Sequence, residues 1–298
     1  MSDATIKLSV IKLGCIGTAP LLDLLFDERA DRADLDTRGF TSGAKLDPGA
    51  CEAVTESALA AGPDLVLIVS PNAVLPGPTR AREICLATGK PVIAIGDSPS
   101  KKAFYRKNDE GKQVVDVPDG LGFFIMASDP MLGARREFLD TTEMALFNAD
   151  VIKVLAATGI LRLVQSSIDA VIEQLKAGDA PSLPRQTCNA ETVLAGGRFS
   201  NAYAASKAFA ALKITESIAA VTGKACFAEK DPARYVAMAA GAHEMLRAAA
   251  GLAAEAREME KAGDALVRTP HANDGTLLAK RSLHPRRTRR PRGGDGTE

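Results

Sequence analysis

The sequence has no excess of charge of either sign. Lysine plus arginine and aspartate plus glutamate each total 37 of the 298 residues, so the formal net charge is +0. A balanced chain exerts no general electrostatic attraction on nucleic acid or on an anionic lipid surface. We therefore expect neither a nucleic acid nor a membrane as a partner of the folded part of the chain.

The sequence also lacks a long hydrophobic run. The stretch from Val151 to Val164 comes nearest, but Lys153 and Arg162 interrupt it, whereas a helix that spans a bilayer needs about 20 consecutive apolar residues. Residues Met1–Thr5 show neither the basic segment nor the apolar segment of a secretory signal. These absences predict a cytoplasmic protein.

Paired cysteines and paired histidines are absent as well. The five cysteines are widely spaced, with no Cys-x-x-Cys pair, and no two of the three histidines lie four residues apart. We interpret this pattern as reduced thiols in a cytoplasmic protein, and we expect no metal site. The sequence contains neither a Gly-x-Ser-x-Gly elbow nor a Walker loop, so nothing in it supports acyl or phosphoryl transfer.

What is present is an alternation of strand-like and helix-like segments over the first 130 residues. Short, continuous apolar strands are typical of a parallel sheet covered on both faces, and single helices between them imply right-handed crossovers. The sequence thus predicts an α/β fold, an open parallel sheet with flanking helices. The expected strands are 6–13, 37–42, 65–69, 92–95 and 123–127, and the expected helices include 18–31 and one begun by Asp47 and Pro48.

From residue 131 onward helical spacing dominates. Asp140–Glu143 resembles a capping box, and the spacing then continues to about Lys176 with a break near Gly159. The polar segment 178–197 is interpreted as a connection, and Asn273–Gly275 is typical of a hairpin turn. The predicted organisation is an α/β part at 1–130, a helical bundle part at 131–264 that ends with helices at 201–220 and 231–262, a small β-hairpin at 265–283 and a disordered tail at 284–298.

The end of the chain is rich in arginine. The segment Arg281–Arg292 contains six arginines and two prolines, and Gly-Gly-Asp-Gly follows it. Such a composition predicts disorder. One interpretation is a solvated tail without a role, and the other is a contact with nucleic acid or an anionic surface.

Ligands of an open parallel sheet gather beyond the carboxyl ends of its strands. Four short segments follow expected strands here, and their glycines and prolines suit tight turns that let backbone amides approach a ligand. The four segments are Gly14-Cys15-Ile16-Gly17, Ser70-Pro71-Asn72, Gly96-Asp97-Ser98-Pro99 and Ser128-Asp129. We expect the binding site among them.

The first of these turns only weakly resembles a nicotinamide site. Gly14 and Gly17 form a Gly-x-x-Gly pattern, which is less specific than Gly-x-Gly-x-x-Gly. The acidic residue that would bind the ribose near the end of the second strand is missing from Thr41–Lys45. Lys45 could still bind a 2′-phosphate, which leaves a phosphorylated nicotinamide open. The alternative is that the two glycines merely turn the chain into the first helix.

Other polar residues allow two interpretations each. Arg135 and Arg136 could bind carboxylates or phosphates, or they could form ion pairs with Glu137 and neighbouring acids. His243 and His271 could act as bases, but a buried histidine with satisfied hydrogen bonds is the commoner case.

Several segments together resemble the coenzyme F420-dependent methylenetetrahydromethanopterin dehydrogenase family. The resemblance is closest from Met131-Leu132-Gly133-Ala134-Arg135-Arg136-Glu137-Phe138-Leu139-Asp140 through Asn148-Ala149-Asp150 to Lys153–Gly159, with further matches at Asp27–Arg32, Pro76-Gly77-Pro78, Ile95-Gly96-Asp97, Ala242–Met245 and Arg268–Ala272. It runs in order from about residue 6 to residue 283.

The resemblance implies reversible hydride transfer between 5,10-methylenetetrahydromethanopterin and a deazaflavin, coenzyme F420, in a homo-oligomer of hexameric type. It implies a coenzyme-binding α/β part with the coenzyme at the strand ends: Gly14, Cys15, Ile16, Gly17, Ser70, Pro71, Asn72, Gly96, Asp97, Ser98 and Pro99. The pterin substrate is expected at Lys12, Asp129, Arg135, Arg136 and Glu137. Asp97 and Asp129 are the candidate catalytic residues, because a carboxylate favours the cationic methenyl product electrostatically. Direct hydride transfer depends mainly on positioning.

Departures from the family pattern concentrate at the strand ends. Cys15 stands where the family has asparagine, Ser70 and Ser100 stand where we expect glycine, and Ala127–Asp129 replaces a Lys-Pro-Asp-like stretch. One hypothesis is that the hydride acceptor has changed to NADP, NAD or a flavin, as in a methylotrophic bacterium. Another is a non-catalytic pterin-binding relative.

Overall fold

A computed structural model describes residues 5–26, 32–130, 140–197, 199–264, 266 and 271–279. Three groups of sequence predictions lie outside these residues. They are most of the Met131–Asp140 block with Arg135, Arg136 and Glu137, most of Asp27–Arg32, and the arginine-rich tail.

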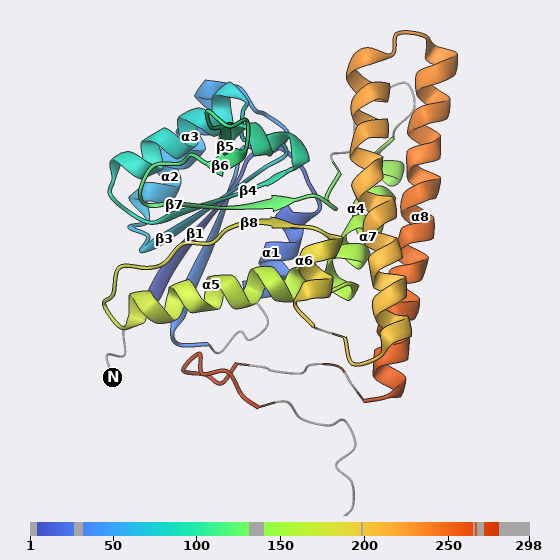
Figure 1. Cartoon of the computed structure of the whole chain (residues 1–298). Coiled ribbons are helices and arrows are strands. Elements are labelled where there is room, and N and C mark those ends of the chain that lie inside the picture. The colour runs from blue at the N-terminus through green and yellow to red at the C-terminus, as the bar shows by residue number, and fades with distance from the viewer. Residues whose placement is uncertain are drawn as a thin grey trace, which may run out of the picture.

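The centre of the molecule is a six-stranded parallel sheet in the order β2-β1-β3-β4-β7-β8 (Figure 1). Its strands are β1 (Ile6–Lys12), β2 (Leu35–Thr41), β3 (Leu65–Ser70), β4 (Val92–Asp97), β7 (Leu121–Met126) and β8 (Arg185–Cys188). The chain passes from β1 outward to β2 and then back across β1 to β3, so the strand order reverses between β1 and β3. This sheet confirms the predicted fold class.

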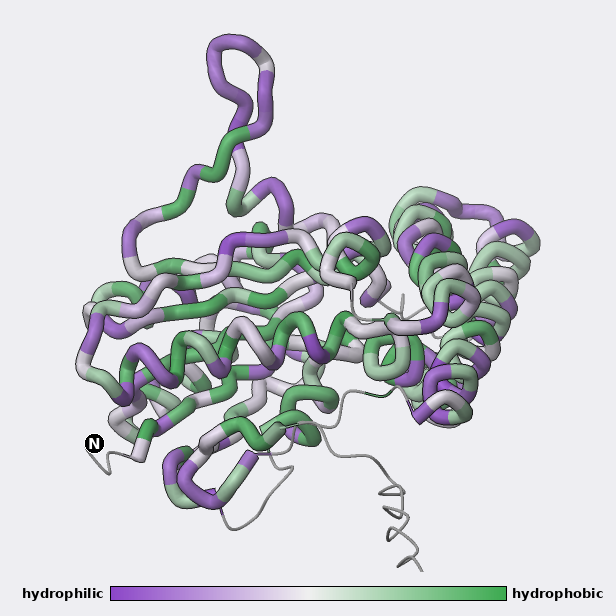
Figure 2. Tube along the Cα trace, turned by 60° about the horizontal axis from the view of Figure 1, so that its bottom comes forward, coloured by the Kyte–Doolittle hydropathy of each residue, from purple (hydrophilic) through white to green (hydrophobic). Residues whose placement is uncertain are grey.

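Two hydrophobic layers cover the sheet. Helices α2 (Pro48–Ala60) and α3 (Pro76–Ala87) lie on one face, and α1 (Thr18–Phe26) and α5 (Ile160–Lys176) lie on the other. Alternate strand residues supply the two layers, so Val66 packs with α2 and α3 whereas Leu67 packs with α1 and α5. Figure 2 shows hydrophobic and hydrophilic residues alternating along α5, as expected for a helix with one side on a sheet.

The helical part lies beyond the carboxyl ends of the strands (Figure 1). It comprises α4 (Thr141–Ala157), α6 (Ala190–Ala195), α7 (Ala202–Gly223), the π-helical η2 (Lys224–Ala228) and α8 (Pro232–Ala262). Asp140, Asn201 and Asp231 begin α4, α7 and α8 by accepting hydrogen bonds from first-turn amides. Gly159, at φ 99°, allows the 66° bend between α4 and α5, which confirms the predicted break.

Three details differ from the sequence predictions. The segment 178–197 is not only a connection, because it contains β8 and α6; β8 has the polar sequence Arg-Gln-Thr-Cys, which gives no apolar strand signal. The short 3₁₀ helix η1 (Ser98–Ala103) and an antiparallel pair, β5 (Tyr105–Lys107) and β6 (Gln113–Val115), were not expected. That pair stands out from the body as a loop with a hydrophilic tip (Figure 2).

Within residues 271–279, the described part of the predicted C-terminal hairpin contains one antiparallel bridge, between His271 and Leu277. The turn between them contains Gly275 at φ 83°. Within the part of the chain that the structure describes, no single helix is long and apolar enough to cross a membrane. The bent pair α4 and α5 passes that test by length and composition alone, and its apolar residues belong to the core.

Candidate functional site at the carboxyl edge of the sheet

The turns predicted to bind ligands lie together at one edge of the sheet. A Cβ added to Gly14 would lie 3.2 Å from Pro71 Cδ, so the turn after β1 contacts the turn after β3. In the parallel register Ser70 is paired with Gly96, which brings the turn after β4 alongside. These contacts place the first three predicted segments side by side where the strand order reverses.

The turn after β1 is shaped by Gly14 and covered by α4. Gly14 has φ 73°, a conformation that favours glycine. Ile16 is buried, whereas Cys15 is exposed with its Sγ 4.0 Å from the Oδ1 of Asn148 on α4. Although the residue is exposed, the surrounding protein removes part of the hydration of the sulfur, and this loss and the nearby charge of Asp129 raise the pKa of Cys15. The thiol therefore stays protonated at neutral pH.

The turns after β3 and β4 are held together by Ser100. Its Oγ accepts a hydrogen bond of 2.9 Å from the amide of Ala73, and it lies 2.2 Å from the place that a Cβ on Gly96 would occupy. Gly96 therefore has no room for a side chain. Asn72 Oδ1 accepts from the amide of Val74 at 3.0 Å, which makes Asn72 a turn-forming residue. Ser98 is half-buried, while Pro71 is buried and Pro99 is exposed.

Asp97, a candidate catalytic residue, is only 2% exposed. Its carboxylate accepts a hydrogen bond from the amide of Ser98 and begins η1. A carboxylate in this position can act on a ligand only through its field, because its side chain does not reach the surface of the edge.

Asp129, the other candidate, is fully buried behind the first turn. Its Oδ1 accepts from the amide of Gly17 at 2.8 Å, and its Oδ2 accepts from the amide of Thr18 at 2.7 Å and from the hydroxyl of Thr18. Burial raises the pKa of Asp129 to about 6, and the hydrogen bonds from Thr18 and Gly17 oppose that rise. Asp129 thus joins the end of β7 to the start of α1.

Lys12, expected to contact the pterin, ends β1 and points toward α1. Its Nζ pairs with Asp23 at 2.8 Å, and its side chain is 20% exposed. Lys12 therefore lies at the rim of the edge with one carboxylate partner. Arg135, Arg136 and Glu137 are outside the described residues.

Sequence reasoning missed the contribution of α4. A Cβ on Gly17 would lie 2.5 Å from Val151 Cγ1, so α4 packs directly on the start of α1. On the same helix Glu143 lies 3.5 Å from Nδ1 of His243 on α8, and the imidazole is tilted against Phe147. The only sequence signal for this arrangement was the resemblance itself, because side chains on separate helices carry no common spacing.

The two histidines are both buried. Burial lowers the pKa of His243, against the raising effect of Glu143, so this imidazole is neutral at pH 7. His271 is 1% exposed, with its Nε2 3.2 Å from Asp169 on α5. Both positions fit the structural interpretation. Within the described ranges no group of three or more metal-binding side chains is close enough to hold an ion.

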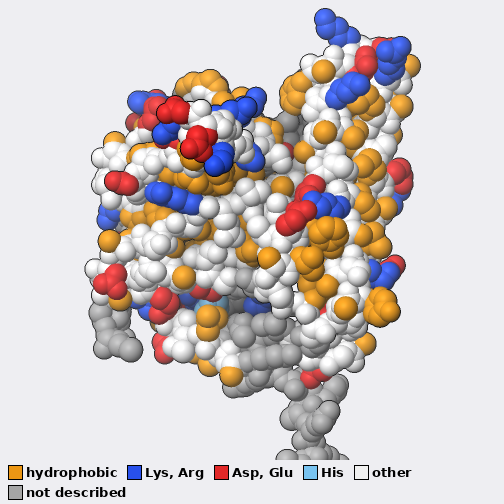
Figure 3. All heavy atoms as spheres, in the orientation of Figure 1, with side chains coloured by type: hydrophobic (Ala, Val, Ile, Leu, Met, Phe, Trp, Pro, Cys, Tyr) orange, Lys and Arg blue, Asp and Glu red, His pale blue; other side chains and the backbone are white. Residues whose placement is uncertain are grey.

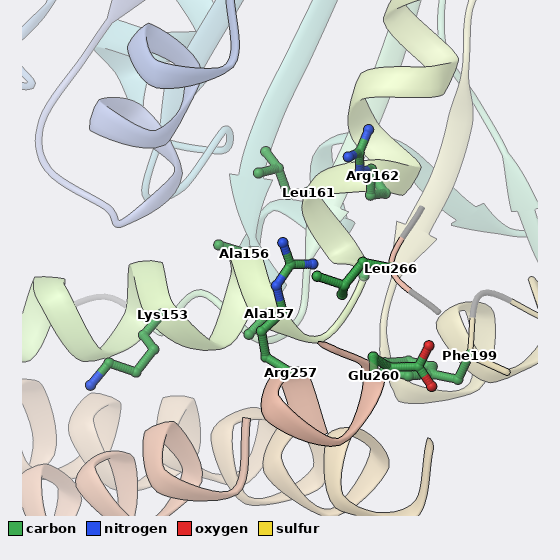
Figure 4. Close-up of a pocket in the computed structure, with 10 residues that line it drawn as sticks. Lys153, Ala156, Ala157, Leu161, Arg162, Phe199, Arg257, Glu260 and Leu266 are labelled. Atoms are coloured by element: carbon green, nitrogen blue, oxygen red, sulfur yellow. The ribbon is translucent and has the colours of Figure 1, made fainter. Parts of the chain in front are cut away.

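A cavity lies between α4, α5 and α8, away from the strand-end turns (Figure 4). This cavity of about 360 Å³ is lined by Lys153, Ala156, Ala157, Gly159, Leu161, Arg162, Phe199, Arg257, Glu260 and Leu266. Figure 4 shows the Arg257 side chain directed between Ala156 and Leu266. The carboxylate of Glu260 accepts from the amide of Asn201 at 2.9 Å. None of the predicted site residues that the structure describes lines this cavity.

Comparisons with known proteins point to one family. The sequence pattern of the methylene-5,6,7,8-tetrahydromethanopterin dehydrogenases matches residues 6–287. An F420-dependent methylenetetrahydromethanopterin dehydrogenase of Archaeoglobus fulgidus is 53% identical over 278 residues, 93% of this chain and 97% of the relative. Its counterpart in Methanothermobacter marburgensis is 47% identical over 278 residues, with 93% and 98% covered.

A solved structure agrees with the sequence comparison. It is an F420-dependent methylene-tetrahydromethanopterin dehydrogenase in complex with methylene-tetrahydromethanopterin and coenzyme F420. The chain is similar to it with a TM-score of 0.86 and 44% identity, covering 94% of this chain and 98% of that one. The match over residues 6–287 and the identity to these relatives therefore show that the chain belongs to the methylenetetrahydromethanopterin dehydrogenase family.

Proposed function

We propose that this chain transfers a hydride reversibly between 5,10-methylenetetrahydromethanopterin and coenzyme F420, giving the methenyl pterin, at the carboxyl edge of its sheet. The observation that carries the proposal is the likeness to a relative solved with both ligands bound, which extends over 94% of this chain at 44% identity. A shared fold alone would not imply a function, and the 44% identity over nearly the whole chain is what supports a shared one.

The edge offers a surface suited to flat ring systems. The Gly14 cradle, which a Cβ would fill against Leu46 and Pro71, lets the backbone approach a ring closely. Cys15, Asn72, Ser98 and Pro99 surround it with small or turn-forming residues. Coenzyme F420, when bound, supplies the ring carbon that accepts the hydride. The residues of this chain position the two rings, and a misplacement of about 1 Å would cost about 100-fold in rate.

The roles of the two buried carboxylates follow from their surroundings. Asp97 and Asp129 both bind backbone amides, so neither is poised to transfer a proton to a ligand. We assign them a field that favours the cationic methenyl pterin and a part in holding the turns. Lys12, Arg135, Arg136 and Glu137 remain the proposed contacts of the pterin.

The test is an absorbance assay with each candidate acceptor. Purified protein and methylenetetrahydromethanopterin are incubated with F420, NADP, NAD or FMN, and the appearance of methenyltetrahydromethanopterin is followed. We expect product with F420 only. Turnover with NADP, NAD or FMN but not F420 would establish the changed-acceptor alternative. No turnover, with a rise in Tm on adding the pterin, would establish a binding protein.

We also propose a cytoplasmic homo-oligomer, as the resemblance implies. Figure 3 shows hydrophobic side chains exposed along the pair of helices α7 and α8, on the right of the view. Tyr203 and Phe227, which lie near the two ends of α7, are 76% and 74% exposed. Exposed aromatic residues of this kind are enriched at interfaces. Light scattering should give a mass that is a multiple of 31.2 kDa, six chains being the proposed number; a single-chain mass would contradict the proposal.

A further inference from the structure

The start of α1 is the place where sheets of this type normally bind a phosphate. The strand order 2-1-3-4 matches that of flavodoxin-like folds, whose ligands bind at the reversal between the first and third strands. Backbone amides at the start of the first helix, together with the helix dipole, hold the phosphate in such folds. A ligand anion at this place needs free amide donors and open space.

No amide donor remains at the start of α1. The amides of Gly17 and Thr18 donate to the carboxylate of Asp129, at 2.8 Å and 2.7 Å. The amide of Ala19 donates to the carbonyl of Ile16 at 3.1 Å. The next residue is Pro20, which has no amide hydrogen. Every backbone amide from Gly17 to Pro20, the first turn of α1, is therefore already bound or absent.

No space remains there either. Asp129 is fully buried, and a Cβ at Gly17 would lie 2.5 Å from Val151 Cγ1 and 3.1 Å from Asp129 Oδ1. Helix α4 thus covers the start of α1 from outside, while the carboxylate fills it from inside. At neutral pH this carboxylate also carries the negative charge that a phosphate would bring, so a second anion would be repelled.

We propose that Asp129 is a specificity-determining residue that occupies the phosphate position of the fold and thereby excludes FMN, NAD and NADP from it. This role in the choice of hydride acceptor rests on the proposed function. The contacts of Asp129 themselves do not depend on that function. The proposal requires the coenzyme to bind across the side of the edge formed by Gly14, Pro71 and Gly96, with its anionic groups away from α1.

The first experiment opens the position and supplies an anion. The full chain with Asp129→Ala and Val151→Ala, the second change removing the α4 side chain that covers the start of α1, is compared with wild type and with Asp231→Ala. Asp231→Ala is a matched control that removes a helix-capping carboxylate at the distant start of α8. Tm is measured in inorganic phosphate and in NaCl of equal ionic strength. We expect phosphate to raise the Tm of the double variant by about 3 °C more than that of the other two proteins. An equal rise in all three, or none in a folded double variant, would overturn the proposal.

A second measurement needs no variant. Hydrogen exchange of the wild-type amides of residues 17–19 should be slow without ligand and unchanged by millimolar phosphate, FMN or NADP, because internal acceptors already hold these amides. Added protection of this segment by any of these would overturn the proposal. Neither experiment depends on turnover, so a failure of the proposed F420 activity would be seen separately.

In the double variant Asp129→Ala with Val151→Ala, binding of NADPH should also tighten at least about tenfold relative to wild type, since two charge-assisted amide donors become available and uncovered. Thr18→Val, which removes only the hydroxyl donor and leaves the carboxylate bound to both amides, should keep the wild-type weakness toward NADPH. Equal NADPH binding by wild type and the double variant would count against the proposal.

Discussion

The two edges of the sheet each contain a buried aspartate, but the partners of the two carboxylates differ. At the carboxyl edge Asp129 is bound by two amides and a hydroxyl, all neutral. At the amino edge Asp34 is bound by the guanidinium of Arg32 at 2.8 and 3.0 Å, and Lys176 lies 3.4 Å away. Burial alone would raise the pKa of both, yet the cations lower that of Asp34 while that of Asp129 rises to about 6.

The difference separates a structural edge from the edge at which we propose the function. The ion pairs of Asp34 fasten the C-terminal turn, since the amide of Ala33 donates to Asn273 at 2.7 Å and Lys176 donates to the carbonyl of Asp274 at 3.1 Å. The described donors to Asp129 are all neutral, so its carboxylate leaves a negative field at the edge where we propose that the cationic pterin product forms. Neutral hydrogen-bond donors stabilise the carboxylate of Asp129 but add no positive charge to neutralise it.

The largest expected effect is an opposite response of the two edges to acid. The folded-state pKa of Asp129 lies above its unfolded value, so the folded chain binds an extra proton between about pH 4 and 6. The contribution of this carboxyl to the free energy of unfolding therefore falls by about 3 kcal/mol as the pH rises through that window. Asp34 has a lowered pKa, so its contribution is full above its unfolded pKa and is lost as pH falls below it. Urea unfolding from pH 3 to 7 measures both.

Two matched Asp→Asn variants test the opposite pH dependence of stability at the two edges. The stability difference between wild type and Asp129→Asn should change with pH between 4 and 6, whereas that between wild type and Asp34→Asn should change only below about pH 4. Parallel pH profiles for the two variants would refute the contrast between the edges.

The next effect is on turnover at the carboxyl edge. Gly17→Ala introduces a Cβ 2.5 Å from Val151 Cγ1, which must push α4 from α1 and shift the turn that we assign to the coenzyme. We expect kcat/KM with F420 to fall about 100-fold. The double variant Gly17→Ala with Val151→Ala should recover most of the loss, because the smaller side chain makes room. An unchanged kcat/KM in the single variant would show that the packing of α4 on α1 does not affect the site.

At the amino edge the corresponding change should affect stability but not catalysis. Gly275 has φ 83°, and a Cβ there would lie 1.8 Å from Asp34 Oδ2. Gly275→Ala should lower the free energy of unfolding by about 2 kcal/mol with kcat unaltered. Gly111→Ala, at φ 74° with open space around it, should lose only about 1 kcal/mol because it carries backbone strain alone. A kcat loss in Gly275→Ala would mean that the amino edge also serves the site.

The smallest effect concerns the exposed thiol. Because partial loss of hydration of the sulfur and the charge of Asp129 raise the pKa of Cys15, iodoacetamide at neutral pH should modify it about tenfold more slowly than free cysteine. Mass spectrometry of the Cys15 peptide gives the rate. A rate equal to that of free cysteine would argue against a negative field at this edge.

Sequence reasoning predicted the sheet because β3, β4 and β7 are continuous apolar stretches, and it predicted helix starts because Asp47, Asp140 and Asp231 are local capping signals. It missed β8, whose polar residues form a strand only because the edge of β7 is available for pairing. It found the strand-end turns through the rule for parallel sheets. It could not predict the hydrogen bonds of Asp129, since the partner amides lie more than a hundred residues away along the chain.

By itself the sequence determined the family and the α/β architecture, because resemblance, apolar periodicity and capping residues are properties of order along the chain. It also predicted that ligands bind at the strand ends. Only the tertiary structure decided what those ends can accept. Asp129 and Val151 come from a distant strand and helix to fill the start of α1, and such occupation depends on packing in space, which no local spacing records.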